Sequence, residues 1–210
     1  MLYAQVHLTL PAWVHEHVDA ARAYAGDADK VALAIELSRL NIEAQSGGPF
    51  GAVVFDGQDR IVSVGVNRVM PHTCSVAHAE TMAYMLAQQR LQTPRLNERI
   101  GPVTLATSSQ PCCMCYGATV WAGIDRLLIG ARSEDVEALT PFDEGPLPAD
   151  WIGALNQRGI EVGSGSLMSV LRSVGLAVGA QHGTRIIAQD VPHDLDAALV
   201  QRADPVRGQR

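Results

Sequence analysis

The chain has 210 residues, of which 47% are apolar and 18% charged, a composition typical of a globular protein with a sizeable core. Its formal net charge is −6 and no run is rich in lysine and arginine, which argues against a nucleic-acid partner held through phosphate contacts. No apolar run approaches the roughly 18 residues that a membrane helix needs, and the first residues lack a signal-peptide pattern, so we expect a cytoplasmic protein without a membrane partner.

The first half of the chain predicts a helix, a β-hairpin and a second helix. Residues 1–26 allow no clean assignment, although 8–10 fit a short strand and Pro11 suits the first turn of a helix. Apolar residues recur at helical spacing after Asp27, and two runs rich in valine flank an Asp-Gly turn at 56–57. We expect these elements at residues 27–44, 50–55 and 61–66, with the second helix beginning near residue 76 after a capping Ser75.

The second half alternates short apolar strands with helices. Strands are expected at residues 102–107, 126–130 and 160–162, and helices at 111–123, 133–139, 151–158 and 167–178. Such alternation favours an α/β fold, a three-layer αβα sandwich around a central mixed sheet of about five strands. We divide the chain into one domain over residues 1–165 and a C-terminal helix and tail over 166–210.

Cys112, Cys115 and His78 predict a metal site. Three of the four cysteines lie within five residues, which does not fit a disulfide framework and indicates metal or redox chemistry. Cys112 and Cys115 are three apart, on one face at the start of a helix, where the helix dipole favours the thiolate that binds zinc. With His78 they make three zinc ligands, the number that catalytic sites use when the fourth position is left open. A redox pair or two buried small residues are the alternatives, and Cys113, on another face, is interpreted as a packing residue.

Glu80 follows His78 by two residues, about 200° around a helix, and is therefore badly placed to bind the same ion. At the start of a helix its longer side chain can still reach a water beside that ion. Zinc lowers the pKa of a bound water from about 15.7 toward 7. We therefore predict that Zn²⁺ is the cofactor and that Glu80 is a catalytic acid–base group.

The pattern His78-x-Glu80, followed by Pro111-Cys112-x-x-Cys115, matches the signature of zinc deaminases that act on bases. Further matching residues are Gly48–Val53, Gly65–Val69, Ala77, Gln110, Tyr116–Ala118, Ala131–Ala138 and Phe142–Pro146. With them the chain resembles the cytidine-deaminase-like superfamily, and within it the bacterial guanine deaminase branch, which includes relatives that accept aminotriazines. The resemblance covers roughly residues 30–165. It implies hydrolytic deamination of a free base, most directly guanine, to give xanthine and ammonia.

The resemblance also implies how a purine would be held. Asn67 would hydrogen-bond the carbonyl and ring-nitrogen edge, and Phe50 and Trp121 would line or stack on the ring. The backbone of Ala79 would contact the reacting end of the base. Glu144 would bind the amino side of guanine and assist proton transfer, since a carboxylate accepts the row of N–H donors that guanine offers.

The C-terminal segment departs from this resemblance. The guanine deaminase branch commonly closes its site with a C-terminal segment of the partner subunit that carries a tyrosine, whereas this chain has no tyrosine after Tyr116. By resemblance alone we expect a homodimer, with residues 166–210 as a candidate lid exchanged between subunits. Three alternatives stay open: another aminated heterocycle or nucleoside as substrate, a tRNA adenosine deaminase, which the acidic charge opposes, and a catalytically silent zinc scaffold, which Glu80 opposes.

Overall fold

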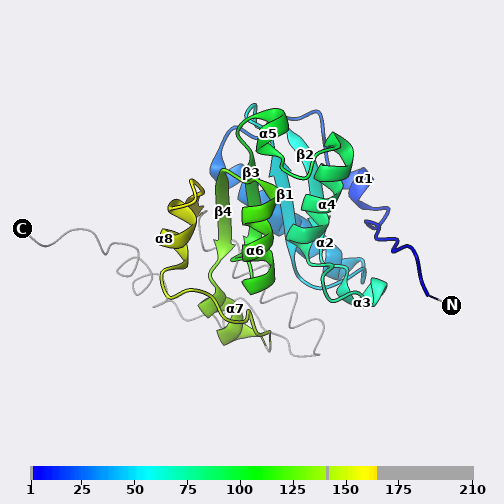
Figure 1. Cartoon of the computed structure of the whole chain (residues 1–210). Helices are drawn as coiled ribbons and strands as arrows, with labels where there is room; N and C mark the ends of the chain where they lie inside the picture. The colour runs from blue at the N-terminus through cyan, green and yellow to red at the C-terminus, as the bar shows by residue number, and fades with distance from the viewer. Residues whose placement is uncertain (1, 141, 165–210) are drawn as a thin grey trace, which may run out of the picture.

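A mixed five-stranded sheet forms the centre of the computed structural model, which describes residues 2–140 and 142–164 (Figure 1). Its strands are β1 (Gly51–Phe55), β2 (Ile61–Val66), β3 (Thr104–Ser109), β4 (Arg126–Ala131) and β5 (Glu161–Ser164). They lie in the order β2–β1–β3–β4–β5. β1 pairs antiparallel with both β2 and β3, whereas β4 runs parallel to β3 and β5. The predicted hairpin is therefore one edge of a larger mixed sheet.

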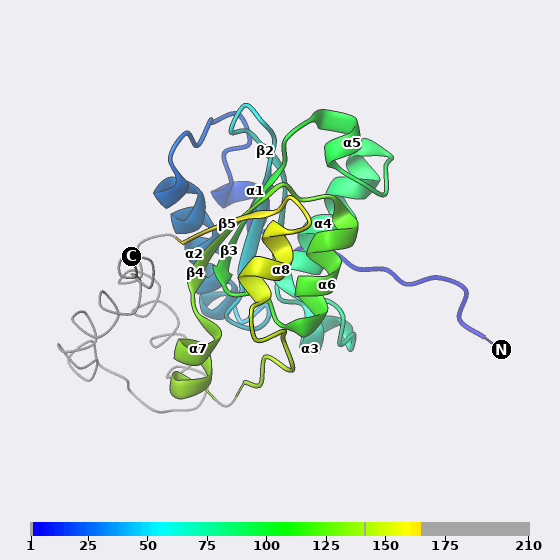
Figure 2. The same ribbon diagram turned by 60° about the vertical axis from the view of Figure 1, so that its left-hand side comes forward.

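Helices cover both faces of this sheet. They are α1 (Val14–His17), α2 (Asp27–Glu43), α3 (Val69–His72), α4 (Ala79–Leu91), α5 (Asn97–Ile100), α6 (Cys113–Ala122), α7 (Ser133–Leu139) and α8 (Trp151–Asn156). The long helix α2 packs on one face, and α4, α6 and α8 pack on the other (Figure 2). Among the described residues, no helix has the length and apolar character needed to cross a bilayer.

Alternation of side chains along the strands builds a core on each face. Successive residues of a strand point to opposite sides of the sheet. In β1, Val53 and Phe55 join the buried cluster that contains Leu37 of α2. Ala52 and Val54 join the cluster on the other face, which contains the buried residues of α4. These two apolar layers around one sheet confirm the predicted three-layer αβα sandwich with a mixed sheet of five strands.

Two helices begin later than the sequence predicts, and both shifts bear on the site. α4 begins three residues after the predicted start, because His78 holds an extended backbone (φ −70°, ψ 162°) at the N-cap, so that Ser75 is not the cap. α6 begins at Cys113, since Cys112 is its N-cap residue (φ −61°, ψ 171°). An N-cap residue stands beside the free backbone N–H groups of the first turn. His78 and Cys112 therefore both lie at the open end of a helix.

Other predicted elements differ at their edges. Residues 8–10 form no strand, and the short helices α3 and α5 occupy segments for which the sequence predicts none. β3 and β5 each end two residues later than predicted. The helix predicted at 167–178, and with it the C-terminal segment 166–210, lies outside the described residues.

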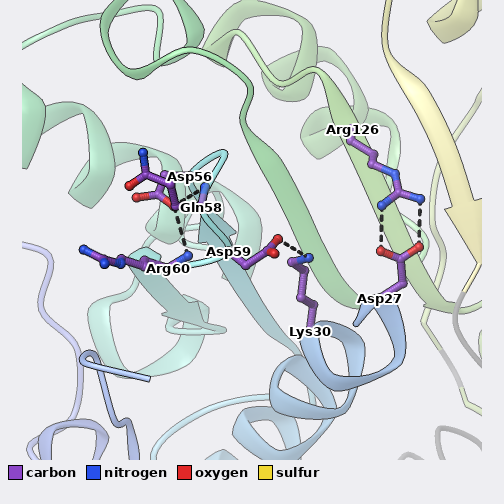
Figure 3. A network of polar contacts seen from close by, with 7 residues as sticks. All are labelled: Asp27, Lys30, Asp56, Gln58, Asp59, Arg60 and Arg126. Carbon is purple, nitrogen blue, oxygen red and sulfur yellow. Dashed lines mark hydrogen bonds and ion pairs between the residues drawn. The ribbon is translucent and has the colours of Figure 1, made fainter. Parts of the chain in front are cut away.

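Ion pairs fasten α2 to the sheet at the end where β1 runs into the hairpin (Figure 3). Lys30 Nζ lies 2.7 Å from Asp59 Oδ1, and the lysine side chain is only 4% exposed. Arg126 of β4 donates two hydrogen bonds to the carboxylate of Asp27, at 2.6 and 2.7 Å. The buried ammonium needs such a partner, because an uncompensated charge inside a protein is strongly destabilising.

We expect Asp59→Asn to lower the free energy of unfolding by about 1–3 kcal/mol, because it leaves the Lys30 ammonium buried beside a neutral amide. The loss stays below that of a fully buried pair, since the Asp59 side chain is 38% exposed. Residue 59 has a left-handed backbone (φ 62°) that Asn adopts as readily as Asp. Urea unfolding measures the change, and Glu36→Gln, in an exposed pair on α2, is the control expected to cost less than about 1 kcal/mol. Unchanged stability of Asp59→Asn would contradict a stabilising role for the pair.

Candidate metal centre and catalytic cleft

The amino-terminal ends of α4 and α6 meet and bring three metal-binding side chains together. His78 Nδ1 lies 3.5 Å from Cys112 Sγ and 3.7 Å from Cys115 Sγ. The ligand atoms of the three residues all lie within 4.8 Å of one another. One imidazole nitrogen and two thiolates form a donor set that suits zinc, and three protein ligands leave one tetrahedral position for water or substrate. His78, Cys112 and Cys115 are thus positioned to bind Zn²⁺, as the sequence predicts.

The two sulfurs of this centre differ in how easily they lose a proton. Hydrogen bonds from the Cys115 thiol and from His78 lower the pKa of Cys112 to about 4. The hydrogen bond that Cys115 donates raises the pKa of that thiol, and the hydrogen bond to Cys112 raises the pKa of the His78 ring. Zinc binds the thiolate and neutral imidazole. Metal binding therefore draws protons out of this hydrogen-bonded cluster.

A buried chain of hydrogen bonds holds the two ligand-bearing helices together. Thr119 Oγ1 of α6 donates to the backbone oxygen of Cys115 at 2.8 Å and accepts from the Tyr84 hydroxyl of α4 at 2.7 Å. Close packing adds to this, because a Cβ at Gly65 of β2 would lie 2.0 Å from the backbone oxygen of Ala79. Only glycine at that position allows α4 to lie so near the sheet.

Glu80 is buried beside the metal ligands and also lines the adjoining cleft. Its Oε2 lies 3.4 Å from Cys115 Sγ. Burial raises the pKa of this carboxyl to about 7. A group that titrates near neutral pH can both accept and return a proton under working conditions. The position and the pKa of Glu80 are therefore those of a general acid–base group.

A cleft of about 880 Å³ opens over these groups. It is lined by six of the residues that the sequence nominates, namely Phe50, Asn67, His78, Glu80, Cys112 and Glu144. They come from the loop before β1, the end of β2, the starts of α4 and α6, and the loop after α7. A volume of this size accommodates a small organic ligand.

Asn67 and Glu144 offer opposite hydrogen-bonding character to this cleft. Asn67 Oδ1 accepts from the backbone N–H of Val69 at 3.2 Å, which leaves its Nδ2 as a donor. Burial, together with the nearby negative charge of Cys112, raises the pKa of Glu144 to about 7. The backbone oxygen of Glu144 accepts from the N–H of Cys113 at 2.9 Å, so its loop is fixed to the start of α6. An amide donor and a carboxyl group therefore line the same ligand-sized cleft.

Three nominated residues do not line this cleft: Cys115, which is fully buried with the other metal ligands, Trp121 and Ala79. Trp121 is 76% exposed and is not among the lining residues. It follows Cys115 by six positions, about 240° around the helix, so α6 directs the tryptophan away from the inward-facing sulfur. Ala79 lies between His78 and Glu80 with its side chain fully buried in the core, and it does not line the cleft either. A backbone contact from Ala79 to a ligand remains a proposal.

The structure adds lining residues that the sequence did not single out. Phe142 packs edge-on against Phe50, with ring centroids 5.3 Å apart, and the buried Gln110, two residues before Cys112, also lines the cleft. Phe142 and Gln110 both lie in segments that carry the resemblance, Phe142–Pro146 and Gln110–Cys112, and this was the available signal. Cys113 is not part of the ligand cluster, as predicted, but it is exposed, with its Sγ beside Gly145, rather than a buried packing residue.

Comparisons with known proteins agree with this geometry. A family model for the cytidine and deoxycytidylate deaminase zinc-binding region matches residues 26–131. A probable cytosine deaminase of Schizosaccharomyces pombe is 36% identical over 107 residues, which cover 50% of this chain and 62% of that protein. The guanine deaminase of Bacillus subtilis is 37% identical over 112 residues, covering 53% of this chain and 67% of the relative. The chain thus spans about two thirds of the length of these relatives or slightly less.

Similarity in three dimensions extends further along the chain. The solved structure of a guanine deaminase from Nitrosomonas europaea has a TM-score of 0.79 and 38% sequence identity, and the match covers 85% of this chain and 99% of that one. The family match includes His78, Glu80, Cys112 and Cys115, the groups that meet at the starts of α4 and α6. The chain therefore belongs to the cytidine and deoxycytidylate deaminase family of zinc-dependent deaminases.

Proposed function

We propose that this protein hydrolyses the exocyclic amino group of a free nucleobase, guanine in the first place, to give xanthine and ammonia. The observation that carries the proposal is that Asn67 and Glu144 line the same cleft as His78, Glu80 and Cys112. One cleft can therefore bind the edge of a purine and hold its amino group beside the metal centre. The guanine deaminases of Bacillus subtilis and Nitrosomonas europaea, at 37% and 38% identity, support this choice of base.

Glu80 carries the proton transfers in this proposal. Zinc, when bound by His78, Cys112 and Cys115, supplies a water that loses a proton near neutral pH. Glu80 takes that proton and passes it to the ring nitrogen next to the reacting carbon. The water oxygen forms a bond to the ring carbon that carries the amino group, which gives a tetrahedral adduct. Glu80 then takes the remaining hydroxyl proton and gives it to the amino group. The C–N bond breaks, ammonia leaves, and the carbon–oxygen bond becomes the carbonyl of the product. One water is consumed for each amino group released, so atoms and charges balance.

Recognition of the ring is assigned to residues around the metal centre. Asn67 donates through Nδ2 to the carbonyl edge, consistent with the bond that already occupies its Oδ1. Glu144 accepts from N–H groups on the amino side, and Phe50 lies along the ring with Phe142 behind it. The backbone of Ala79 contacts the reacting end. Trp121 has no role in this scheme within its own chain.

The metal centre, Glu80 and the net charge also bear on other substrates. Another aminated heterocycle, such as an aminotriazine, a cytosine or an adenine derivative, would use the same zinc and Glu80 chemistry. A tRNA substrate is less favoured, because the formal net charge is −6 and phosphate contacts need basic side chains. A catalytically silent scaffold is disfavoured by Glu80, since a metal that only stabilises the fold has no need of a buried acid beside it.

We propose a cytoplasmic homodimer with a role in purine metabolism as the setting of this activity. Two large apolar side chains support an assembly: Trp121 and Met70 are 76% and 82% exposed. A partner subunit that packed over α3 and α6 would bury both side chains. Residues 166–210 are proposed as the segment that closes the cleft of the neighbouring subunit.

An ammonia-release assay tests the proposed function. Zinc-loaded protein is offered guanine, 8-azaguanine, cytosine, adenine, ammeline and their nucleosides at neutral pH. We expect guanine to give the highest kcat/KM, because Glu144 and Asn67 suit its amino and carbonyl edges. Free bases should exceed nucleosides, because the similar proteins of Bacillus subtilis and Nitrosomonas europaea are guanine deaminases. Release from no aminated ring would exclude a deaminase, and a clear preference for cytosine would retain the chemistry while replacing guanine as the substrate.

A further inference from the structure

Asn41 is a fully buried polar residue on α2, outside the cleft lining, and all of its hydrogen-bonding groups are engaged at the edge of the cleft. Its Nδ2 donates to the backbone oxygens of Gly48, at 2.8 Å, and Asn67, at 2.9 Å. Its Oδ1 accepts from Ser46 Oγ at 2.7 Å. A primary amide has two donor hydrogens, and both are used on backbone carbonyls of loops that line the cleft.

The two loops that Asn41 joins meet without room for another atom. A Cβ at Gly47 would lie 1.8 Å from the backbone oxygen of Asn67 and 2.7 Å from Asn41 Nδ2. The backbone N–H of Asn67 also donates to the oxygen of Phe50 at 3.1 Å. The backbone of Asn67 is therefore held on both sides, by Asn41 at its oxygen and by the loop before β1 at its nitrogen.

The side chain of Asn67 depends on this backbone clamp. Its Oδ1 is bonded to the N–H of Val69, so the direction of Nδ2 follows from where residues 67–69 lie. Without the Asn41 donors, the buried backbone oxygen of Asn67 would lose its side-chain partner. The part-buried oxygen of Gly48 would keep only the N–H of Phe50, at 2.8 Å. The freed carbonyl of Asn67 would then shift toward water. Such a shift would misplace Nδ2 relative to the ring it is proposed to recognise.

We infer that Asn41 is a positioning residue that sets the affinity for the ring by fixing Asn67, while leaving the zinc and proton-transfer groups untouched. The inference rests on the proposed role of Asn67 in binding the base. The metal ligands and Glu80 lie at the starts of α4 and α6, and none of them is bonded to Asn41 within the described residues. Loss of Asn41 should therefore appear in KM and scarcely in kcat.

Asn41→Asp is the sharpest variant, since it keeps the acceptor for Ser46 and places an oxygen against both carbonyls. We expect KM for guanine to rise about 10-fold or more, with kcat within about threefold and zinc content unchanged. Asn67→Ala alone should raise KM at least as much. The double variant should be no worse than Asn67→Ala within about twofold, because the effect of Asn41 passes through Asn67.

Asp59→Asn, at the far end of β1, controls for destabilisation, because it lowers stability without touching either loop. If Asn41→Asp does not fold, Ser46→Ala replaces it in the comparison of single and double variants with Asn67→Ala. We expect Ser46→Ala to raise KM about two- to fourfold and to add nothing further to Asn67→Ala in the double variant.

Three results would each overturn the inference. The KM increases of Asn41→Asp and Asn67→Ala could multiply in the double variant, Asn41→Asp could leave KM unchanged, or it could lower kcat and the zinc content. An unchanged KM in Asn67→Ala also overturns it, while the guanine deaminase proposal stands. Absence of ammonia release by the unsubstituted protein would instead refute the proposed function, and this inference with it.

Discussion

Replacement of Glu80 by glutamine is expected to lower kcat for the preferred base by about 10²–10⁴-fold while leaving one zinc ion bound. Glutamine has the same shape as glutamate but cannot carry a proton between water, ring and leaving group. Its amide fills the same buried space beside Cys115 Sγ, which lies 3.4 Å from the carboxylate, and can donate to that sulfur. The metal centre should therefore persist without its acid–base group.

Steady-state kinetics with metal analysis of the same samples measure this outcome. Glu98→Gln, an exposed carboxylate on α5, is the matched control and should retain full activity. Activity retained by Glu80→Gln would show that another group moves the proton. Loss of zinc together with activity would instead identify Glu80 as part of the metal centre.

Cys115→Ala is expected to remove both zinc and activity. Cys115 is fully buried between His78 and Glu80, and it is one of only three ligands that the described residues supply. Two remaining ligands cannot hold zinc against dilution, so metal content should fall below about a tenth of one ion per chain. The melting temperature should fall as well, because binding of the metal favours the folded state.

Cys113→Ala provides the control for Cys115→Ala in the same helical turn. Its thiol is exposed, and its contact with Glu144 runs through the backbone N–H, which alanine keeps. This variant should bind zinc and turn over substrate normally. Full zinc content in Cys115→Ala, or its loss in Cys113→Ala, would mean that the ligand set is misassigned.

Local sequence patterns were enough to predict the metal-binding and acid–base groups of this protein and the layers of its fold. His78-x-Glu80 and Cys112-x-x-Cys115 predict zinc ligands and their acid neighbour, because helix-terminal spacing places such groups without help from distant residues. The alternation of apolar strands with helices likewise predicted the αβα layers, since each element buries a face that its own periodicity defines. Even so, helix starts were misplaced by two or three residues at His78 and Cys112, where an N-cap with extended backbone replaces a first turn.

Only the tertiary structure decided which residues share the cleft. Phe142 packs against Phe50, and Asn41 binds the backbone of Asn67. The partners in each contact are far apart in sequence, so no local pattern predicts them. Trp121 shows the converse, because a motif places it near Cys115 in sequence while helix rotation directs it to the surface. The sequence by itself thus identified the residues of the metal centre, because the spacing within each helix start is local. The contact of His78 with Cys112 and Cys115 still depends on α4 and α6 packing together. The substrate-facing side depends on how two loops and a hairpin end pack against α2, and that packing exists only in the folded chain.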